Sequence, residues 1–462
     1  MENVGEKVTI AGWVNSVRNL GGVTFVTIRD HFGVTQVILD GQEAPARESV
    51  VSITGEVLER ISKNPKMPTG DIEIKVEKME ILGACNKVLP FEIADAENTR
   101  EDLRLRYRYL DLRNPANHER IVLRSKLMQY VRNYMHNHDF LEVQTPILTA
   151  SSPEGARDFI VPSRKFHGKF YALPQAPQQF KQLLMCGGID KYFQIAPCFR
   201  DEDARSDRVY GEFYQLDLEM AFATEEDVLE VGEKVFYETF KEFAPTKKLS
   251  EKPFVRLSYK ESMERFGTDK PDLRNPLELI DLTDVFEETT FRPFRGVTVK
   301  GIVVEDIASK SNSWFNELVE YAESIGMPGI GYFKVLEDMS FAGPIDKFLS
   351  EEEREDLIDV AKLKPESVIF FIADRKHAYK YASLIRDELG RKLDLIDKDE
   401  FKFCIVKDFP MYEWSEEEDQ YIFTHNPFSM PQGGMDALTS KKPEDRWRNG
   451  HGYQGQMFEK AI

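Results

Sequence analysis

The stretch CFRDEDARSDRVYGEFYQLDLEM, residues 198–220, decides how the middle of this chain folds. Its first half sets arginines and carboxylates almost side by side, and its second half, EFYQLDLEM, alternates polar and apolar side chains. Such alternation is typical of a strand with one buried face. We therefore expect two strands joined by a charged loop, which could hold a cation for a phosphate and carboxylates for an amine. A charged hairpin tip without a ligand would have the same composition.

The composition is that of a globular protein with several domains. The chain has 462 residues, 41% of them hydrophobic and 31% charged. Its four cysteines are scattered without the spacing of a zinc site or a disulfide framework, which favours a reducing cytoplasm. The first residues contain no signal-peptide core, and apolar runs such as VIFFIA, residues 368–373, are too short to cross a membrane.

The charge balance disfavours broad, sequence-independent binding of nucleic acid. The formal net charge is −19, whereas phosphate contacts need lysine and arginine. Local clusters matter more than the total, and RLRYRYLDLR, residues 104–113, is such a cluster. The sequence thus leaves room for a shaped, locally basic site.

The N-terminal part is predicted to be a small β-barrel. Residues 7–78 contain short segments rich in Val, Ile and Thr and broken by Gly and Pro, which is the pattern of an OB fold. On one segment Phe25 and Thr27 share a face. Trp13, Arg18, Phe25, Arg29 and Gln36 could form a surface that stacks and hydrogen-bonds unpaired bases, although Phe25 and Trp13 could equally be core residues.

The rest of the chain alternates helical and extended patterns. Apolar residues recur at helical spacing over 117–139 and over 226–245, and FLEVQTPIL, residues 140–148, is expected to be extended. Between about 284 and 400, strand-like and helix-like segments alternate regularly, which predicts an α/β unit of its own. Strand character resumes at FKFCIVKDFPMYEW, so this unit interrupts a larger domain.

Several side chains are candidates for a site that activates a carboxylic acid with ATP. Such a reaction needs a cation where charge builds on the α-phosphate, and groups that align both reactants. Arg200 suits the phosphate, because its planar fork binds oxyanions. Lys181 and Gln178 are three residues apart on the predicted helix of APQQFKQLLM, and could face a ligand or simply solvent. His425, in a loop rich in Pro and Gly, is a further candidate.

These segments resemble the bacterial-type aspartyl-tRNA synthetases, which are class II aminoacyl-tRNA synthetases. The resemblance runs from Val8 to about Asp445 and includes AGWVNSVRNLGGVTFVTIRD, RLRYRYLDLRNP, FLEVQTPILTASSPEGARDFIVPSR, FYALPQAPQQFKQLLM, FRDEDARSDR, FGTDKPDLRNP and THNPFSMPQ. It implies an α+β multidomain protein: an OB-fold barrel, a class II antiparallel sheet with helices, and an inserted α/β domain of the GAD type.

The resemblance also implies the order of the domains and the substrates. The expected order is residues 1–88 for the OB-fold anticodon-binding domain, 89–115 for a linker, 116–283 for the first part of the catalytic domain, 284–400 for the inserted domain and 401–462 for the second part of the catalytic domain. We expect a cytoplasmic aspartate–tRNA ligase that uses ATP, Mg²⁺, L-aspartate and tRNA-Asp. The segment around Pro146 would be motif 1, which builds a homodimer, and no membrane is involved.

Individual roles follow from the same resemblance. Arg200 would be the catalytic residue, contacting both the α-phosphate and the aspartate α-carboxylate. Lys181 would hold the side-chain carboxylate of aspartate. The implied ATP-binding residues are Arg200, Asp201, Glu202 and Phe213. The implied aspartate-binding residues are Glu154, Gln178, Lys181, Arg200, Gln215, Asp217 and His425. The implied anticodon-binding residues are Arg18, Phe25, Gln36 and Glu73. No protein side chain is expected to be a metal ligand.

The sequence departs from the family at Ala176 and in its last part. Ala176 stands where the family usually has a serine that helps bind the ammonium group. After residue 445 the chain reads RWRNGHGYQGQMFEKAI, without the family's motif 3, so the resemblance implies a C-terminally incomplete sheet with an exposed strand edge and impaired catalysis. Leu20, in the anticodon-reading loop, favours tRNA-Asp alone.

Two other functions remain open on the sequence. A non-catalytic relic could bind tRNA through its barrel and form no adenylate. An asparaginyl or lysyl ligase of the same class is the other alternative, but the inserted domain and FGTDKPDLRNP argue against it.

Overall fold

The computed structural model describes residues 2–151, 156–202, 211–415, 419–424 and 431–447. The chain divides into two compact units, residues 1–122 and residues 123–462. The helix α3, Pro115–Asn137, continues through the boundary between them. Each unit is described by itself below.

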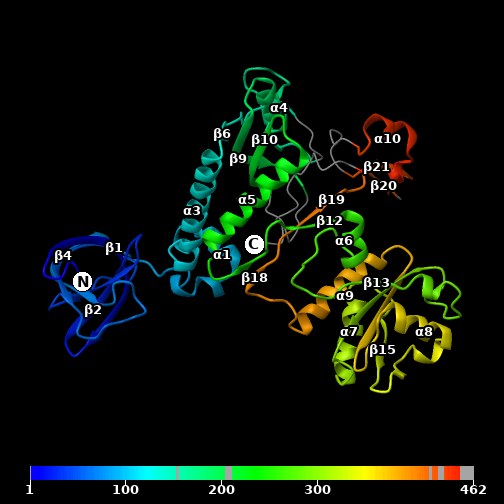
Figure 1. Cartoon of the computed structure of the whole chain (residues 1–462). Helices are drawn as coiled ribbons and strands as arrows, with labels where there is room; N and C mark the ends of the chain where they lie inside the picture. The colour runs from blue at the N-terminus through cyan, green and yellow to red at the C-terminus, as the bar shows by residue number, and fades with distance from the viewer. Residues whose placement is uncertain (1, 152–155, 203–210, 416–418, 425–430, 448–462) are drawn as a thin grey trace. The chain divides into compact units, whose positions relative to one another are not determined.

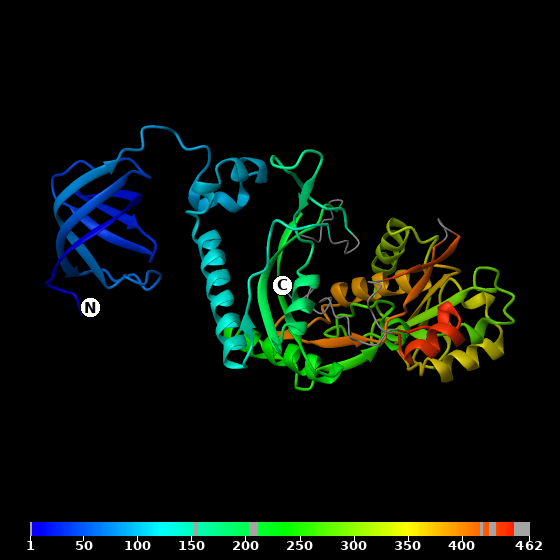
Figure 2. The ribbon, with the colours of Figure 1, turned by 90° about the horizontal axis from the view of Figure 1, so that it is seen from above.

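The first unit begins with a closed five-stranded barrel, which confirms the predicted OB fold (Figures 1 and 2). Its strands pair in the order β1-β2-β3-β5-β4. Alternate residues of each strand point inward, among them Val14, Val26 and Val37, and these fill the core. The strands are β1 (Lys7–Leu20), β2 (Val23–Arg29), β3 (Val34–Leu39), β4 (Val50–Glu59) and β5 (Ile72–Gly83).

The basic run RLRYRYLDLR folds around a buried carboxylate. It forms the short helices α1 (Glu101–Arg106) and α2 (Arg108–Asp111). Asp111 is fully buried and accepts hydrogen bonds from Arg104 Nε at 2.8 Å, from Asn117 Nδ2 at 2.9 Å and from Arg108. Because a buried charge must be paired, Arg104 and Arg108 stabilise the fold through Asp111, while Arg106 and Arg108 are also exposed to solvent.

The second unit contains the sheet that the stretch 198–220 forms. The strands β9 (Lys191–Phe199) and β10 (Glu212–Met220) pair in antiparallel fashion, as predicted. The short strand β6 (Leu141–Glu142) adds to β9 in parallel, so the sheet is mixed. Helices α3 and α5 (Glu225–Phe243) cover one face, where Val131, Val235 and Leu216 share a core (Figure 1). The extended stretch predicted over 140–148 is thus a strand for only two residues.

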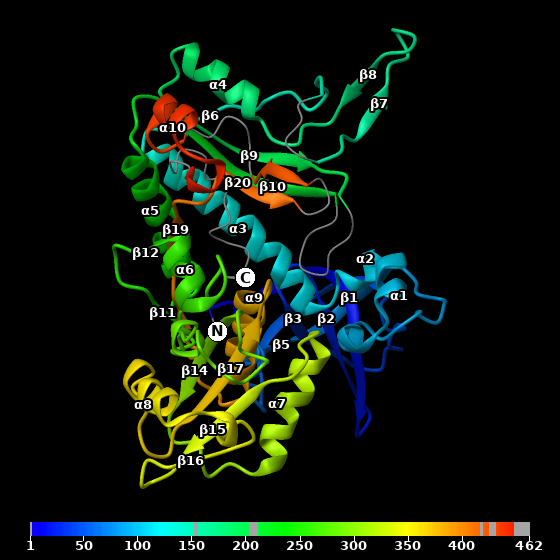
Figure 3. The same cartoon turned by 90° about the vertical axis from the view of Figure 1, so that its right-hand side faces the viewer.

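The predicted alternating unit is present as a five-stranded sheet with helices on both faces (Figure 3). The strand order is β13-β14-β17-β15-β16. Helices α7 and α9 pack on one face through Phe315 and Ile385, and α8 packs on the other through Leu357. The elements are β13 (Ile280–Asp281), β14 (Thr298–Val304), α7 (Asn312–Ser324), β15 (Gly331–Val335), β16 (Phe341–Ala342), α8 (Glu351–Val360), β17 (Val368–Asp374) and α9 (Ala378–Lys392). The domain limits given above stay predictions.

Strands on either side of this unit lie side by side, which is the geometry of an insertion. β12 (Val255–Ser258) pairs in parallel with β19 (Cys404–Lys407), and β11 (Lys248–Leu249) pairs with β18 (Glu400–Phe401). The remaining elements are β7 (Ile160–Pro162), β8 (Phe170–Ala172), α4 (Gln178–Cys186), α6 (Tyr259–Phe266), β20 (Tyr412–Ser415), β21 (Gln420–Phe423) and α10 (Gly434–Ser440). Among the described helices, none combines the length and the apolar character that a membrane span requires.

Candidate functional site

One face of β10 carries a row of polar and aromatic side chains. Phe213, Gln215, Asp217 and Glu219 alternate with residues that include Leu216 and Leu218, which point into the core under α3 and α5. The register sets Phe213 opposite Cys198, Gln215 opposite Ala196 and Asp217 opposite Gln194 on β9. The period of two therefore brings four candidate side chains to the same side of the sheet.

Arg200 lies directly after β9, at the end of this row. Its backbone N–H donates to Gly211 O at 2.8 Å, which closes the two strands, and its Nε donates to Gln175 O at 3.3 Å. The guanidinium carbon stands 5.0 Å from the centre of the Phe213 ring, a cation–π contact. Its Nη2 is buried and has no hydrogen-bond partner among the described residues. A buried donor of this kind fits an anionic ligand.

Lys181 approaches the other end of the row from α4. Its Nζ lies 2.9 Å from Asp217 Oδ1 and 3.4 Å from Glu219 Oε2. Burial lowers the pKa of Lys181, but the two carboxylates outweigh it and hold the pKa above its ordinary value. The ammonium group has three N–H donors, and the described residues offer two acceptors for them, so one donor is available to a ligand.

The helix α4 is positioned by the sequence PQAPQQ. Pro177 takes the N-cap position, and the helix begins at Gln178, which is half-buried. Pro at the helix start costs no hydrogen bond, because the first N–H groups have no partner within the helix. Pro174 O accepts from Phe199 N at 2.9 Å, which fixes the segment to the end of β9. This contact and the first turn of α4 bring Lys181 over the sheet.

Gln175 is a positioning residue that the sequence did not reveal. It is 1% exposed. Its Nε2 donates to Ala156 O at 2.9 Å and to Asp158 Oδ1 at 2.5 Å, while its carbonyl accepts from Arg200. It therefore ties the segment around Ala156 to the arginine. The only signal in the sequence is a polar residue between two prolines.

The floor of the site is a second buried network that was not anticipated. Gln194 accepts from Tyr192 Oη at 2.9 Å and from Thr145 Oγ1 at 3.0 Å. Burial, and then the charge of Asp217, raises the pKa of the Tyr192 hydroxyl. The tyrosine thus stays neutral beneath Asp217.

Glu219 is a further residue of the site that the sequence analysis did not name, although strict alternation from Asp217 would have found it.

Other predicted residues lie apart from the row or outside the described residues. Asp201 is half-exposed and pairs with Arg157, its Oδ2 lying 3.6 Å from Nε. Glu202 is exposed, and Ala176 is buried beside the start of α4. Glu154 and His425 lie outside the described residues, as do residues 203–210 of the charged loop.

The barrel carries a second candidate surface. Arg18 lies opposite Phe25 in the β1–β2 register, and both point outward, away from the core formed by Val26. Phe25 is therefore not a core residue, and it is half-buried on the outer face. Trp13 is half-buried and lies under the guanidinium of Arg113, 4.9 Å from its ring centre.

The polar part of this surface is one hydrogen-bonded group. Gln36 Nε2 donates to Glu73 Oε2 at 2.7 Å, and Arg60 Nη2 donates to Gln36 Oε1 at 3.1 Å. The structure thus brings the two predicted residues together and adds Arg60. An aromatic ring beside cations and amide groups is a surface that can stack an unpaired base and hydrogen-bond its edge.

The described residues contain no group of three or more His, Cys, Asp or Glu that could hold a metal ion. What the row on β10 offers is a separation of charge: an arginine and an aromatic ring at one end, and one cation flanked by two carboxylates at the other. This arrangement complements a zwitterion that carries an additional anionic group.

Comparison with known proteins identifies similar chains for both units. Residues 100–449 match the model of tRNA synthetases class II (D, K and N), and residues 8–82 match that of the OB-fold nucleic acid binding domain. The aspartate–tRNA(Asp/Asn) ligase of Rickettsia bellii is 47% identical over 100% of this chain and 79% of its own length. The ligase of the same name from Zymomonas mobilis is 48% identical over 96% and 76%. Asparaginyl-tRNA synthetase from Pyrococcus horikoshii, 22% identical with a TM-score of 0.51 over 83% of this chain and 93% of that one, shares the fold.

Proposed function

The chain belongs to the aspartate–tRNA ligase family of class II tRNA synthetases, and from this membership we propose that it activates L-aspartate and attaches it to tRNA-Asp. In the first step an oxygen of the aspartate α-carboxylate attacks the α-phosphorus of ATP, and pyrophosphate leaves. In the second step a ribose hydroxyl at the 3′ end of the tRNA attacks the carbonyl carbon, and AMP leaves.

The observation that carries this proposal is the buried Nη2 of Arg200, which has no hydrogen-bond partner among the described residues. The guanidinium would bind the α-phosphate and the α-carboxylate, where charge builds as the new bond forms. Phe213, whose ring centre stands 5.0 Å from the guanidinium carbon, would stack on adenine. Arg200 is held by Gln175 before any substrate arrives, so little reorganisation accompanies the reaction. Asp201 and Glu202 are included in the proposed ATP site, and their assignment rests on the sequence resemblance alone.

The lysine end of the row would bind aspartate. Lys181 would direct its remaining N–H at the side-chain carboxylate, and Asp217 and Gln215 would lie near the ammonium and carboxylate groups of the main chain. Asparagine carries an uncharged amide in place of the carboxylate, so it gains no charge–charge attraction to the ammonium of Lys181. The roles of Gln178, Glu154 and His425 in this pocket rest on the sequence resemblance.

Mg²⁺ would enter as part of the Mg–ATP substrate. This ion prefers octahedral oxygen coordination and usually keeps several waters, binding through phosphates and one or two carboxylates. The proposal assigns the ion no cage of protein ligands. Action in the cytoplasm is a further part of the proposal, supported by four cysteines that are all unpaired.

A homodimer through the segment around Pro146 is part of the same proposal. β6 is an edge strand, and an unpaired edge invites another strand. The exposed apolar side chains of α3 and this segment in the second unit are Leu123, Leu127, Leu141, Ile147 and Leu148. Such a set on one segment is typical of a contact with another chain.

The names of the two related ligases indicate a second tRNA substrate, tRNA-Asn. Both are named for tRNA-Asp and tRNA-Asn, whereas Leu20 in this sequence favours tRNA-Asp alone. Leu20 is the last residue of β1 and is 65% exposed, so it could contact a base directly. Aminoacylation of separate tRNA-Asp and tRNA-Asn transcripts decides between the two: charging of tRNA-Asn would extend the proposed function to both.

The first test of the proposal is ATP–pyrophosphate exchange by the full chain. Exchange should depend on aspartate and should be far slower with asparagine. If the chain binds tRNA but catalyses no aspartate-dependent exchange, it acts as an RNA-binding protein and the proposed reaction is wrong.

Replacement of Phe25 by alanine is expected to weaken binding of tRNA-Asp about fivefold or more, because stacking on one base contributes roughly 1–3 kcal/mol. Fluorescence anisotropy with a labelled transcript measures this. Phe32→Ala is the matched control, since Phe32 is 91% exposed in the turn after β2, outside the surface of Arg18, Phe25, Gln36 and Glu73. Unchanged binding by Phe25→Ala, or an equal loss by Phe32→Ala, would show that Phe25 does not stack on the tRNA.

A further inference from the structure

The hairpin of β7 and β8 exposes an unusual set of side chains. It extends away from the neighbouring helices and strands of the second unit (Figure 3). Its aromatic residues Phe166, Phe170 and Tyr171 are 51%, 55% and 38% exposed. Arg164, Lys165 and Lys169 lie among them and are exposed as well. The fold does not use these rings in a core, so they are available to a ligand.

The charge of this hairpin is opposite to that of the chain. Residues 159–177 contain Arg164, Lys165 and Lys169 and no aspartate or glutamate. At the average of the whole chain, 80 acidic residues in 462, this stretch would contain about three. In a chain of net charge −19, a cationic segment of this length complements a polyanion.

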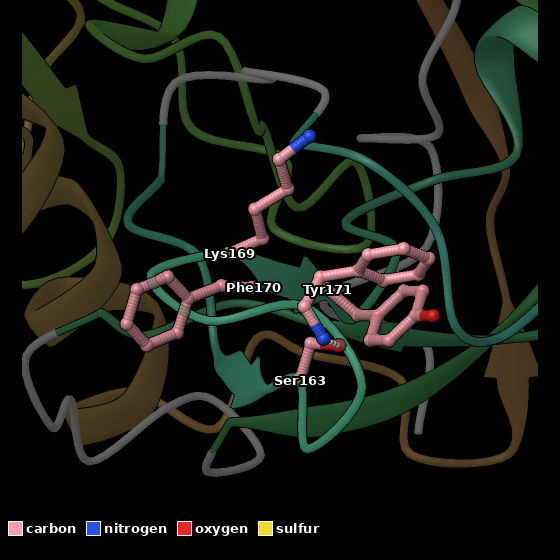
Figure 4. A pocket seen from close by; sticks show the side chains of 5 residues that line it. Ser163, Lys169, Phe170 and Tyr171 are labelled. Carbon is pink, nitrogen blue, oxygen red and sulfur yellow. Dashed lines mark hydrogen bonds between the residues drawn. The ribbon is translucent and has the colours of Figure 1, made fainter.

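The two faces of the hairpin differ in what they present. The pairs Val161–Tyr171 and Pro162–Phe170 direct the two rings to opposite sides of β8, as Figure 4 shows. Lys169 directly precedes β8 and is exposed. An open cavity of about 220 Å³ is lined by Ser163, Phe166, Lys169, Phe170 and Tyr171. Lys165 Nζ stands 5.7 Å from the Phe166 ring centre.

The base of the hairpin leads into the site on β10. Leu173 N donates to Phe159 O at 2.9 Å, which closes the hairpin, and two residues later Gln175 O accepts from Arg200 Nε. Gly211, the partner of Arg200, lies against the Phe159 ring. A strand bound along the hairpin can therefore reach Arg200 with one of its ends.

We propose that the β7–β8 hairpin binds the unpaired 3′ nucleotides of the tRNA, with bases stacked on its aromatic rings and phosphates at Lys165 and Lys169. This inference rests on the proposed function, because it takes tRNA as the substrate. Alternating cations and exposed rings match a single strand, whose bases are free to stack and whose backbone carries the charge. A duplex would not offer its base faces, and an acidic peptide would not need the rings.

The test compares two RNA probes: a tRNA-Asp transcript and the same transcript without its unpaired 3′ nucleotides. Tyr171→Ala and Phe166→Ala should each weaken binding of the complete transcript about fivefold or more. Lys165→Ala and Lys169→Ala should each reduce the slope of log Kd against log salt by about 0.7. The shortened transcript should bind the wild-type chain more weakly, and the four variants should lower its affinity no further.

Lys234→Ala, at an exposed lysine of α5, is the matched control and should bind both transcripts as the wild type does. Equal losses with both transcripts would place the hairpin contact elsewhere on the tRNA and overturn the inference, as would unchanged binding of the complete transcript. ATP–pyrophosphate exchange, which needs no tRNA, is measured in parallel on the wild type. Absence of exchange would contradict the proposed reaction, while the binding comparison would still decide the role of the hairpin.

Discussion

Arg200→Gln is expected to reduce aspartate-dependent ATP–pyrophosphate exchange about 10²- to 10³-fold. Glutamine retains hydrogen-bond donors but removes the positive charge beside the developing negative charge of the α-phosphate. It also removes the stack on Phe213, at 5.0 Å, and the Nη2 that has no hydrogen-bond partner among the described residues. The loss should appear mainly in kcat, because the guanidinium interacts most strongly with the transition state.

Two further variants separate this role from a structural one. Arg200→Lys keeps the charge but loses the planar fork, so its rate should lie between those of the wild type and Arg200→Gln. Arg265→Gln removes an arginine at the same 5.0 Å from a phenylalanine ring, Phe266, on α6, and exchange should persist. Near-normal exchange by Arg200→Gln would refute the assignment of the catalytic residue.

Lys181→Met is expected to abolish aspartate-dependent exchange and to lower the free energy of unfolding by about 3–5 kcal/mol. The lysine is 9% exposed and faces Asp217, which is equally buried, and Glu219. Removing the cation leaves the buried carboxylate of Asp217 without its partner, which is far costlier than losing an exposed ion pair. Urea denaturation measures the stability, and exchange measures the activity.

The double variant Lys181→Met/Asp217→Asn distinguishes the two effects. It removes the uncompensated charge of Asp217 together with its partner, so it should regain part of the stability but none of the exchange. Lys234→Met, which breaks the exposed pair with Glu230, should cost at most about 1 kcal/mol. Recovery of exchange in the double variant would mean that Lys181 only neutralises Asp217 and does not bind aspartate.

Local patterns predicted most of the fold. The alternation of Val and Ile with polar residues in 7–78 gives strands whose inward faces close the barrel, and the regular rhythm after residue 284 gives the five-stranded sheet. These predictions succeed because each depends on the period of a single segment. FLEVQTPIL was predicted less well, since only Leu141 and Glu142 find a partner strand, and strand pairing is not a local property.

The row on β10 was also accessible from the sequence. Phe213, Gln215 and Asp217 follow the period of two, so a single strand suffices to put them on one face. The same rule extends to Glu219. The resemblance supplied the substrates, and the comparisons confirm the family to which it pointed.

The sequence by itself therefore determined the elements, the family and the face of β10 that carries the chemistry. Only the tertiary structure decided which side chains meet: Lys181 with Asp217 and Glu219, and Arg200 with Gln175 and Phe213. It also showed that Arg104 and Arg108 serve a buried Asp111 and that three aromatic rings of the β7–β8 hairpin lie exposed. The physical reason is that a contact between distant segments depends on strand register, helix docking and burial. These are set by the packing of the whole unit and not by the period of any one segment.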